Sequence, residues 1–269
     1  MRLRLPITAF LAGSILLLGS VHFIRAAART AAPANDEGVR TPVLIELFTS
    51  EGCSSCPPAD ALLQRLDQSQ PITGAELIVL SEHVDYCDDI GWRDPYSSRE
   101  YTERQSAYAA QFGHGSVYTP QMVVDGHFEF VGSDERRATQ AIRDATKVKK
   151  APACISVTST DDHAATVHVE AGPLPSPIAT QSADVFLAIA DNSDESQVSR
   201  GENAGRTLQH VAVLRNLIRI GAVDNAAGFA QDMKIDLNGS NPRSLRIAVI
   251  VQEAAAGRVW AVGLARFTN

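Results

Sequence analysis

The stretch ELFTSEGCSSCPPAD, residues 46–60, joins an apolar segment to a helical pattern through a Cys-x-x-Cys motif. Residues 42–48 are too short and too apolar for a surface helix, so they predict a buried strand. Apolar side chains then recur at helical spacing, which predicts a helix over about 54–68 with one packed face. Free N–H groups and the helix dipole at such a helix start favour a thiolate. Cys53 is therefore the expected nucleophile and Cys56 the resolving thiol.

The first half of the chain continues with alternating strands and helices. Residues 76–84 form a second apolar run of strand length, and a helix between two such strands suggests a parallel βαβ unit. Residues 85–118 interrupt the pattern and predict an inserted helix. Two short apolar runs around Asp125-Gly126 predict a hairpin, and 134–149 carries the pattern of a closing helix.

The sequence pattern changes at residue 151, where short segments rich in Val, Ile and Leu begin to alternate with turn residues. Such spacing is typical of an antiparallel β-sandwich. The expected strands are 153–159, 165–170, 184–190, 207–218, 228–236, 245–252 and 258–266. The predicted organisation is an α/β domain at 41–150, with its insert at about 85–118, followed by an all-β sandwich domain at 151–269.

The N-terminal segment has the features of an export signal. Arg2 and Arg4 precede an apolar run that ends near residue 24, and small residues follow. Residues 1–28 are expected to be a signal peptide or an uncleaved N-terminal anchor, and residues 29–40 a linker. The mature protein is then expected in an oxidising compartment, either the bacterial periplasm or the medium as a secreted protein.

The charge balance excludes some partners. Removal of residues 1–28 takes three arginines from the 24 basic residues, which leaves 21 against 31 acidic residues and a net charge of −10. An acidic body argues against nucleic acid and anionic membrane surfaces as partners. Contact with a membrane is expected only if the N-terminal segment stays uncleaved.

Three placed features resemble the thioredoxin fold: the Cys pair at a helix start, Thr119-Pro120 leading a hairpin, and the closing helix. The resemblance implies a cis Pro120 packed against the Cys pair. It also implies that Thr119 offers backbone hydrogen bonds to a bound peptide. The predicted fold class is thus a thioredoxin-like α/β domain with a helical insertion, ahead of the sandwich.

Longer phrases resemble a family of exported bacterial proteins of unknown function with a thioredoxin-like domain. These phrases are ELFTSEGCSSCPPAD, HVDY followed by GWRDPY, YTPQMVVDG and RGENAGRTLQH. The resemblance implies the fold and the compartment but brings no substrate. One departure from the family pattern is Cys87, which stands where an aromatic residue usually follows HVDY.

Acidic and histidine side chains near the predicted strand ends are candidate partners of the Cys pair. Glu46, if buried, would accept a proton from the resolving thiol; the alternative is a solvated position on the strand. His83 and Asp85 end the second strand, on the sheet edge expected to carry the Cys pair. They would tune the thiolate, bind a metal or serve the structure. Trp92, together with Asp94 and Tyr96, would either roof the site or pack in the core.

A polar, glycine-containing loop is the last candidate region. It would reach over the Cys pair to bind an acidic substrate or stabilise a thiolate, or else be a solvated surface loop. Its candidate residues are Arg200, Glu202, Asn203 and Arg206, with His210 just after it.

The sequence favours a thiol–disulfide oxidoreductase that acts on an unidentified protein or small-molecule thiol or disulfide and needs no cofactor. One alternative is a copper carrier with Cys53, Cys56 and His83 as ligands. Another is a non-enzymatic binding module in which the Cys pair is a structural disulfide. Whether Cys87 and Cys154 pair with each other is left open.

Overall fold

The computed structural model describes residues 40–159, 164–176, 180–237 and 239–267. The signal peptide or anchor expected at 1–28 lies outside these residues, and so does the expected linker apart from Arg40. Among the described helices, none has the length and apolar character needed to cross a membrane.

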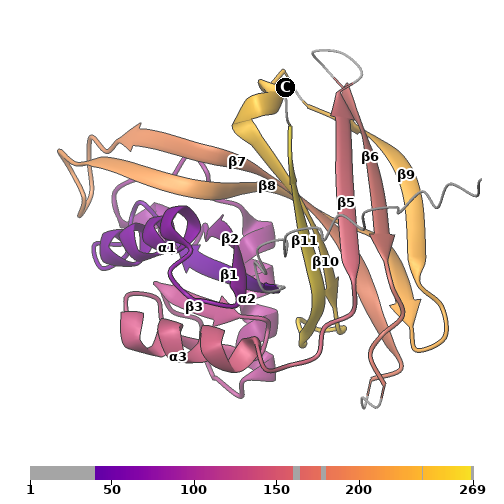
Figure 1. The fold of residues 1–269 in the computed structure, drawn as a ribbon. Coiled ribbons are helices and arrows are strands. Elements are labelled where there is room, and N and C mark those ends of the chain that lie inside the picture. The colour runs from indigo at the N-terminus through magenta and orange to yellow at the C-terminus, as the bar shows by residue number, and fades with distance from the viewer. Residues whose placement is uncertain (1–39, 160–163, 177–179, 238, 268–269) are drawn as a thin grey trace, which may run out of the picture. The chain divides into compact units, whose positions relative to one another are not determined.

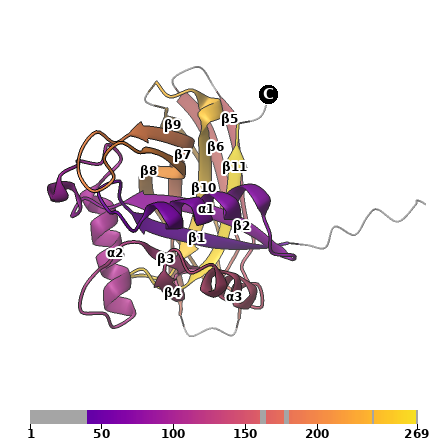
Figure 2. The same cartoon turned by 90° about the vertical axis from the view of Figure 1, so that its left-hand side faces the viewer.

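An eight-stranded mixed sheet contains strands from both halves of the chain (Figures 1 and 2). Its order is β11-β10-β7-β8-β2-β1-β3-β4. From the first half come β1 (Thr41–Thr49), β2 (Ala75–His83), β3 (Gln121–Val124) and β4 (Phe128–Val131). From the second half come β7 (Ser182–Gln197), β8 (Thr207–Asp224), β10 (Leu245–Gln252) and β11 (Val259–Arg266). As the sequence predicts, β1 and β2 are parallel.

Helices cover both faces of the first half of this sheet. On one face, α1 (Pro57–Ser69) and α3 (Glu135–Ala145) pack with the odd-numbered β1 residues around Ile45. On the other face, α2 (Arg99–Gln111) contributes Tyr101 to a core that includes Leu44. Successive β1 side chains point to opposite faces of the sheet, and helices cover both faces. For this reason every β1 residue from position 43 onward is buried, and neither face of the strand meets solvent.

The hairpin and the helix starts follow local chemistry. Asp125 and Gly126 have φ values of 51° and 60° and form the centre of the tight turn between β3 and β4, in which the N–H of His127 donates to the Val124 carbonyl at 3.0 Å. The α1 helix begins at Pro57 instead of the expected residue 54, because turns occupy the Cys-x-x-Cys segment. In the insert, Ser98 caps α2 by accepting a hydrogen bond from the backbone N–H of Glu100 at 3.2 Å. A short 3-10 helix, η1 (Asp88–Ile90), precedes it.

A separate three-stranded antiparallel sheet has the order β5-β6-β9. Its strands are β5 (Ala153–Ser159), β6 (Ala164–Ala171) and β9 (Phe229–Asp236). Val167 and Val169 on β6 share one apolar core with Val185 on β7, Val249 on β10 and Ala261 on β11. The small sheet therefore packs on the second-half strands of the long sheet, and every strand expected after residue 151 is present.

The boundary predicted at residue 150 does not divide the long sheet. Ser81 on β2 pairs in parallel with Val213 on β8, so β7, β8, β10 and β11 continue the sheet of the first half. The sequence assigned these strands to a sandwich of their own. The physical reason for the difference is that β2 would otherwise present an unpaired edge, and β8 covers that edge.

Candidate functional site

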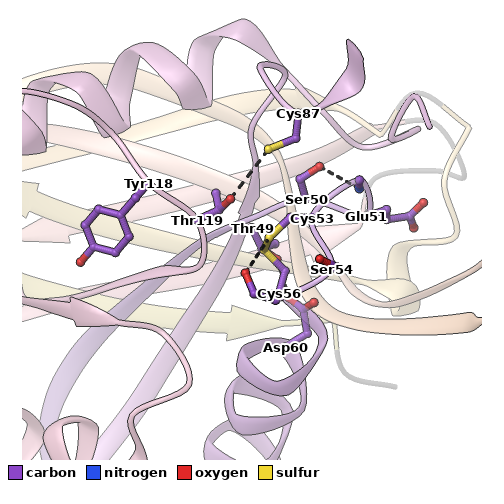
Figure 3. The surroundings of a disulfide bond; sticks show 12 residues. Thr49, Ser50, Glu51, Cys53, Ser54, Cys56, Asp60, Cys87, Tyr118 and Thr119 are labelled. Carbon is purple, nitrogen blue, oxygen red and sulfur yellow. Dashed lines mark hydrogen bonds between the residues drawn. A yellow bond between two sulfur atoms is a disulfide. The ribbon is translucent and has the colours of Figure 1, made fainter. Parts of the chain in front are cut away.

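The Cys53–Cys56 pair forms a disulfide in the loop between β1 and α1 (Figure 3). Backbone turns shape this loop: the N–H of Cys53 donates to the Ser50 carbonyl at 3.1 Å, and the N–H of Cys56 donates to the Cys53 carbonyl at 3.2 Å. Cys53 is 7% exposed and Cys56 is 0% exposed. Cys53 is thus the more exposed cysteine of the pair, as expected for the residue that an external thiol would attack.

Thr119 and Pro120 are joined by a cis peptide bond, as the resemblance implies, and Thr119 lies near the disulfide (Figure 3). The Thr119 hydroxyl lies 3.7 Å from Cys87 Sγ. Cys87 belongs to the same buried apolar cluster as Cys53 and Cys56. Burial raises the pKa of the Cys87 thiol, which keeps it protonated. Both Cys87 and Cys154 are free thiols, and Cys154 is exposed on β5.

Glu51 is the centre of the polar contacts around the Cys loop, and sequence reasoning did not single it out. Its buried carboxylate accepts from Trp92 Nε1 at 2.7 Å and lies 3.1 Å from His210 Nε2. Its backbone N–H donates to Asp94 Oδ2 at 2.8 Å, and its carbonyl accepts from Asn203 Nδ2 at 2.8 Å. Trp92 therefore fixes the Cys loop through a hydrogen bond, in addition to any packing role.

Two buried histidines meet under this loop. His83 Nδ1 lies 2.7 Å from Asp94 Oδ2, and the rings of His83 and His210 are 4.7 Å apart, edge to face. Burial opposes the charged form of Asp94, but His83 and backbone donors outweigh it and lower the pKa of Asp94. Burial likewise opposes protonation of His210, yet Glu51 and neighbouring carboxylates raise the pKa of His210. The contact with His83 thus favours the charged form of Asp94, and the contact with Glu51 favours the protonated form of His210.

Asp60 is a second residue that the sequence pattern did not reveal. It lies one turn after Cys56 on α1, is buried, and accepts a hydrogen bond from Thr49 Oγ1 at 2.9 Å (Figure 3). Burial raises the pKa of Asp60, while the nearby His210 and His83 oppose that rise. The sequence signal that could have marked Asp60 is its position beside the apolar helical positions Ala59, Leu62 and Leu63.

The loop between β7 and β8 reaches the Cys pair. Asn203 is buried, and its Nδ2 donates to both the Glu51 carbonyl and, at 3.0 Å, the Cys53 carbonyl. Arg206 donates to Asn203 Oδ1 at 3.1 Å. Glu202 Oε2 accepts from the backbone N–H of Ser54 at 3.2 Å. The β7–β8 loop therefore lies against the Cys loop, which is one of the two positions that the sequence left open for it.

Other candidates lie elsewhere. Glu46 is buried, but it pairs with Arg104 of α2 on the opposite side of the sheet from α1. Asp85 accepts from Thr102 Oγ1 at 2.6 Å, which ties it to the start of α2. Arg200 is an exposed loop residue. The structure therefore gives Glu46 and Asp85 partners of their own, apart from the disulfide.

The copper alternative requires His83 to join the two cysteines as a ligand. The Nδ1 atom of His83 is committed to Asp94, and its ring packs against His210. In the part of the chain that the structure describes, no three His, Cys, Asp or Glu side chains are grouped as a metal site.

A family model described as "Protein of unknown function (DUF1223)" matches residues 44–252, which is most of the chain. The chain belongs to this family. No protein with a curated description matches it.

Solved structures show what the chain is similar to. Protein AGR_C_4864 from Agrobacterium tumefaciens has a TM-score of 0.64 and 24% identity, over 86% of this chain and 98% of that one. HBP35 of Porphyromonas gingivalis has a TM-score of 0.58 and 15% identity, over 86% of this chain and 76% of that one. At these identities the likeness concerns the fold alone.

Proposed function

We propose that the protein is a thiol–disulfide oxidoreductase that acts through Cys53 and Cys56. The observation that carries the proposal is the disulfide at the start of α1, with Cys53 as its more exposed residue and the cis Thr119-Pro120 bond just before β3. The order β1, α1, β2, then the β3–β4 hairpin and α3, supports a thioredoxin-like core with α2 as its insertion. The substrate class is a thiol or disulfide of a protein or a small molecule.

The reaction follows from the accessibility of the two sulfurs. A substrate thiolate attacks Cys53 Sγ, the Cys53–Cys56 bond breaks, and the Cys56 thiolate that leaves takes up a proton. A mixed disulfide then joins the substrate to Cys53. A second substrate thiolate releases Cys53, or Cys56 attacks Cys53 Sγ and reverses the step. Two electrons pass in total, and no cofactor is needed.

The export expected from the N-terminal segment suits this chemistry. Disulfides form and persist in the periplasm and in secreted proteins. We propose that the protein works there and exchanges disulfides with exported thiol proteins or small thiols.

A dithiol-exchange assay tests the proposal. The wild-type protein should catalyse reduction or oxidation of a model disulfide, and Cys53→Ser should abolish that catalysis. Cys154→Ser serves as the matched control, because Cys154 is an exposed thiol on β5 and should be dispensable. Equal rates for wild type and Cys53→Ser would refute the proposal.

The burial of both cysteines favours a second candidate, a structural disulfide in a binding module. A structural disulfide has a reduction potential below about −300 mV and resists reductants. Reduction of the native protein by excess dithiothreitol, followed by mass spectrometry of alkylated cysteines, separates the two candidates. Rapid and reversible reduction supports the oxidoreductase.

A further inference from the structure

The start of α1 offers few N–H donors to a thiolate on Cys53. A thiolate at a helix N-terminus is normally stabilised by the free N–H groups of the first turn. Here the first two helical residues are Pro57 and Pro58, which have no N–H. The N–H groups of Ala59 and Asp60 already donate to the Cys56 carbonyl, at 2.8 and 3.1 Å.

Three of the four backbone N–H groups in the Cys-x-x-Cys segment, those of Cys53, Ser54 and Cys56, are also engaged. The N–H of Cys56 donates to the Cys53 carbonyl, and the N–H of Ser54 donates to the Glu202 carboxylate. The hydrogen bond from Ser54 lowers the pKa of Glu202, so this carboxylate is charged at neutral pH. A neutral hydroxyl, Ser55 Oγ, lies 3.3 Å from Cys53 Sγ and can donate to a thiolate there.

The titratable groups around the Cys loop are mainly acidic. Glu202 faces it from the β7–β8 loop, and Glu51 lies within it, balanced by His210. Asp60 faces it from α1, and the Cys87 thiol faces it from the insert. Among the described residues, no lysine or arginine forms a hydrogen bond or ion pair with residues 51–58.

From this geometry we infer that the pair is poised to donate electrons, and that Glu202 is a positioning residue that sets this poise through Ser54. The inference rests on the proposed function and gives it a direction. A site that stabilises the thiolate stabilises the reduced form and is oxidising. A site with occupied donors and an adjacent carboxylate disfavours the thiolate, favours the disulfide, and is reducing.

The electron balance needs a donor and an acceptor. An exported dithiol protein reduces Cys53–Cys56 and becomes a disulfide itself. The Cys53 thiolate then attacks a substrate disulfide, whose leaving thiolate takes a proton. Cys56 loses its proton to solvent, attacks Cys53 Sγ and releases the second substrate thiol. Two electrons thus pass from the donor dithiol to the substrate disulfide, and Cys53–Cys56 returns to the oxidised form.

The test compares Glu202→Gln with Glu76→Gln, in a background with Cys87→Ser and Cys154→Ser. Gln at 202 keeps an acceptor for the Ser54 N–H but removes the charge. Glu76 is an exposed glutamate at the far end of β2, so it controls for net charge. Two quantities are measured: the Cys53 pKa of the reduced protein, from thiolate absorbance, and the equilibrium constant with glutathione.

Glu202→Gln should lower the Cys53 pKa and shift the equilibrium toward the dithiol by roughly two- to fivefold, the effect of one exposed charge. For a two-electron couple that is a rise in potential of about 10–20 mV. Glu202→Ala, which also frees the Ser54 N–H, should shift both further. Glu76→Gln should match the parent protein.

Different failures have different meanings. If the parent protein shows no exchange with glutathione, both the proposed function and this inference fall. If it exchanges but Glu202→Gln and Glu202→Ala leave the Cys53 pKa and the equilibrium unchanged, the inference alone is overturned. An equilibrium that strongly favours the dithiol in the parent protein would also overturn it.

Discussion

Replacement of Asn203 by alanine tests whether the β7–β8 loop fastens the Cys loop. The change removes the donors to the Glu51 and Cys53 carbonyls and the acceptor of Arg206. The Cys53 carbonyl keeps its bond from Cys56, so it loses about 0.5–1.5 kcal/mol. The Glu51 carbonyl is left buried without its donor, which costs about 1–3 kcal/mol. Together the expected loss is about 2–4 kcal/mol.

This loss should appear in the reactivity of the disulfide. If attack on Cys53 requires the loop to lift, 2 kcal/mol raises the open population roughly 30-fold. Reduction by dithiothreitol without denaturant should therefore be much faster in Asn203→Ala. The assay follows alkylation of Cys53 and Cys56 over time, with urea unfolding for the free energy.

Asn192→Ala is the matched control. Asn192 also makes three hydrogen bonds, as donor to the Arg243 and Leu245 carbonyls and as acceptor from Arg246 Nε. Its loss should lower stability without accelerating reduction of the disulfide. If both variants, or neither, accelerate reduction, the proposed fastening of the Cys loop by Asn203 is wrong.

Four further predictions concern the surrounding network. Because the pKa of His210 is raised in the folded protein, its stabilising effect is complete below pH 6.5 and is lost as pH rises through that pKa. The advantage of wild type over His210→Gln in urea unfolding should therefore shrink between pH 6 and pH 9, and a constant difference would count against the ion pair with Glu51. Arg104→Met should lower the free energy of unfolding by about 3–5 kcal/mol, since it leaves the buried side chains of Glu46 and Glu82 without their cation. Glu46→Gln should keep wild-type exchange rates, and a large loss of exchange would show that Glu46 takes part in the reaction. Gly52→Ala places a Cβ 2.7 Å from the Cys87 carbonyl oxygen, so it should lower the free energy of unfolding in urea by about 1–3 kcal/mol. An unchanged free energy of unfolding would show that the Cys loop shifts to make room for the methyl group.

Local sequence patterns predicted much of the fold. The strand, Cys pair and helix at residues 42–68, the Asp125-Gly126 hairpin and the strands after residue 151 depend on spacing and turn chemistry within short segments. The continuity of the long sheet depends on β2 meeting β8 through Ser81 and Val213, which are distant in the chain. No local pattern encodes such a pairing.

The candidate site was predicted unevenly for the same reason. Cys53 and Asn203 belong to distinctive motifs, so the sequence suggested that the loop of Asn203 could lie near the Cys pair. Glu51 and Asp60 are isolated acids in a loop and at a helix start, where exposed positions are the rule. Their burial depends on His210, Trp92 and Thr49, which come from other elements.

The central claim is that Cys53–Cys56 is a working redox pair with a reducing poise. Its most direct test is a redox titration of the native protein, with Cys87 and Cys154 replaced by serine. We predict a reversible two-electron transition at about −200 to −270 mV, the range from glutaredoxins to thioredoxin. A disulfide that stays oxidised below about −300 mV would contradict the redox function, and a potential above about −180 mV would contradict the reducing poise.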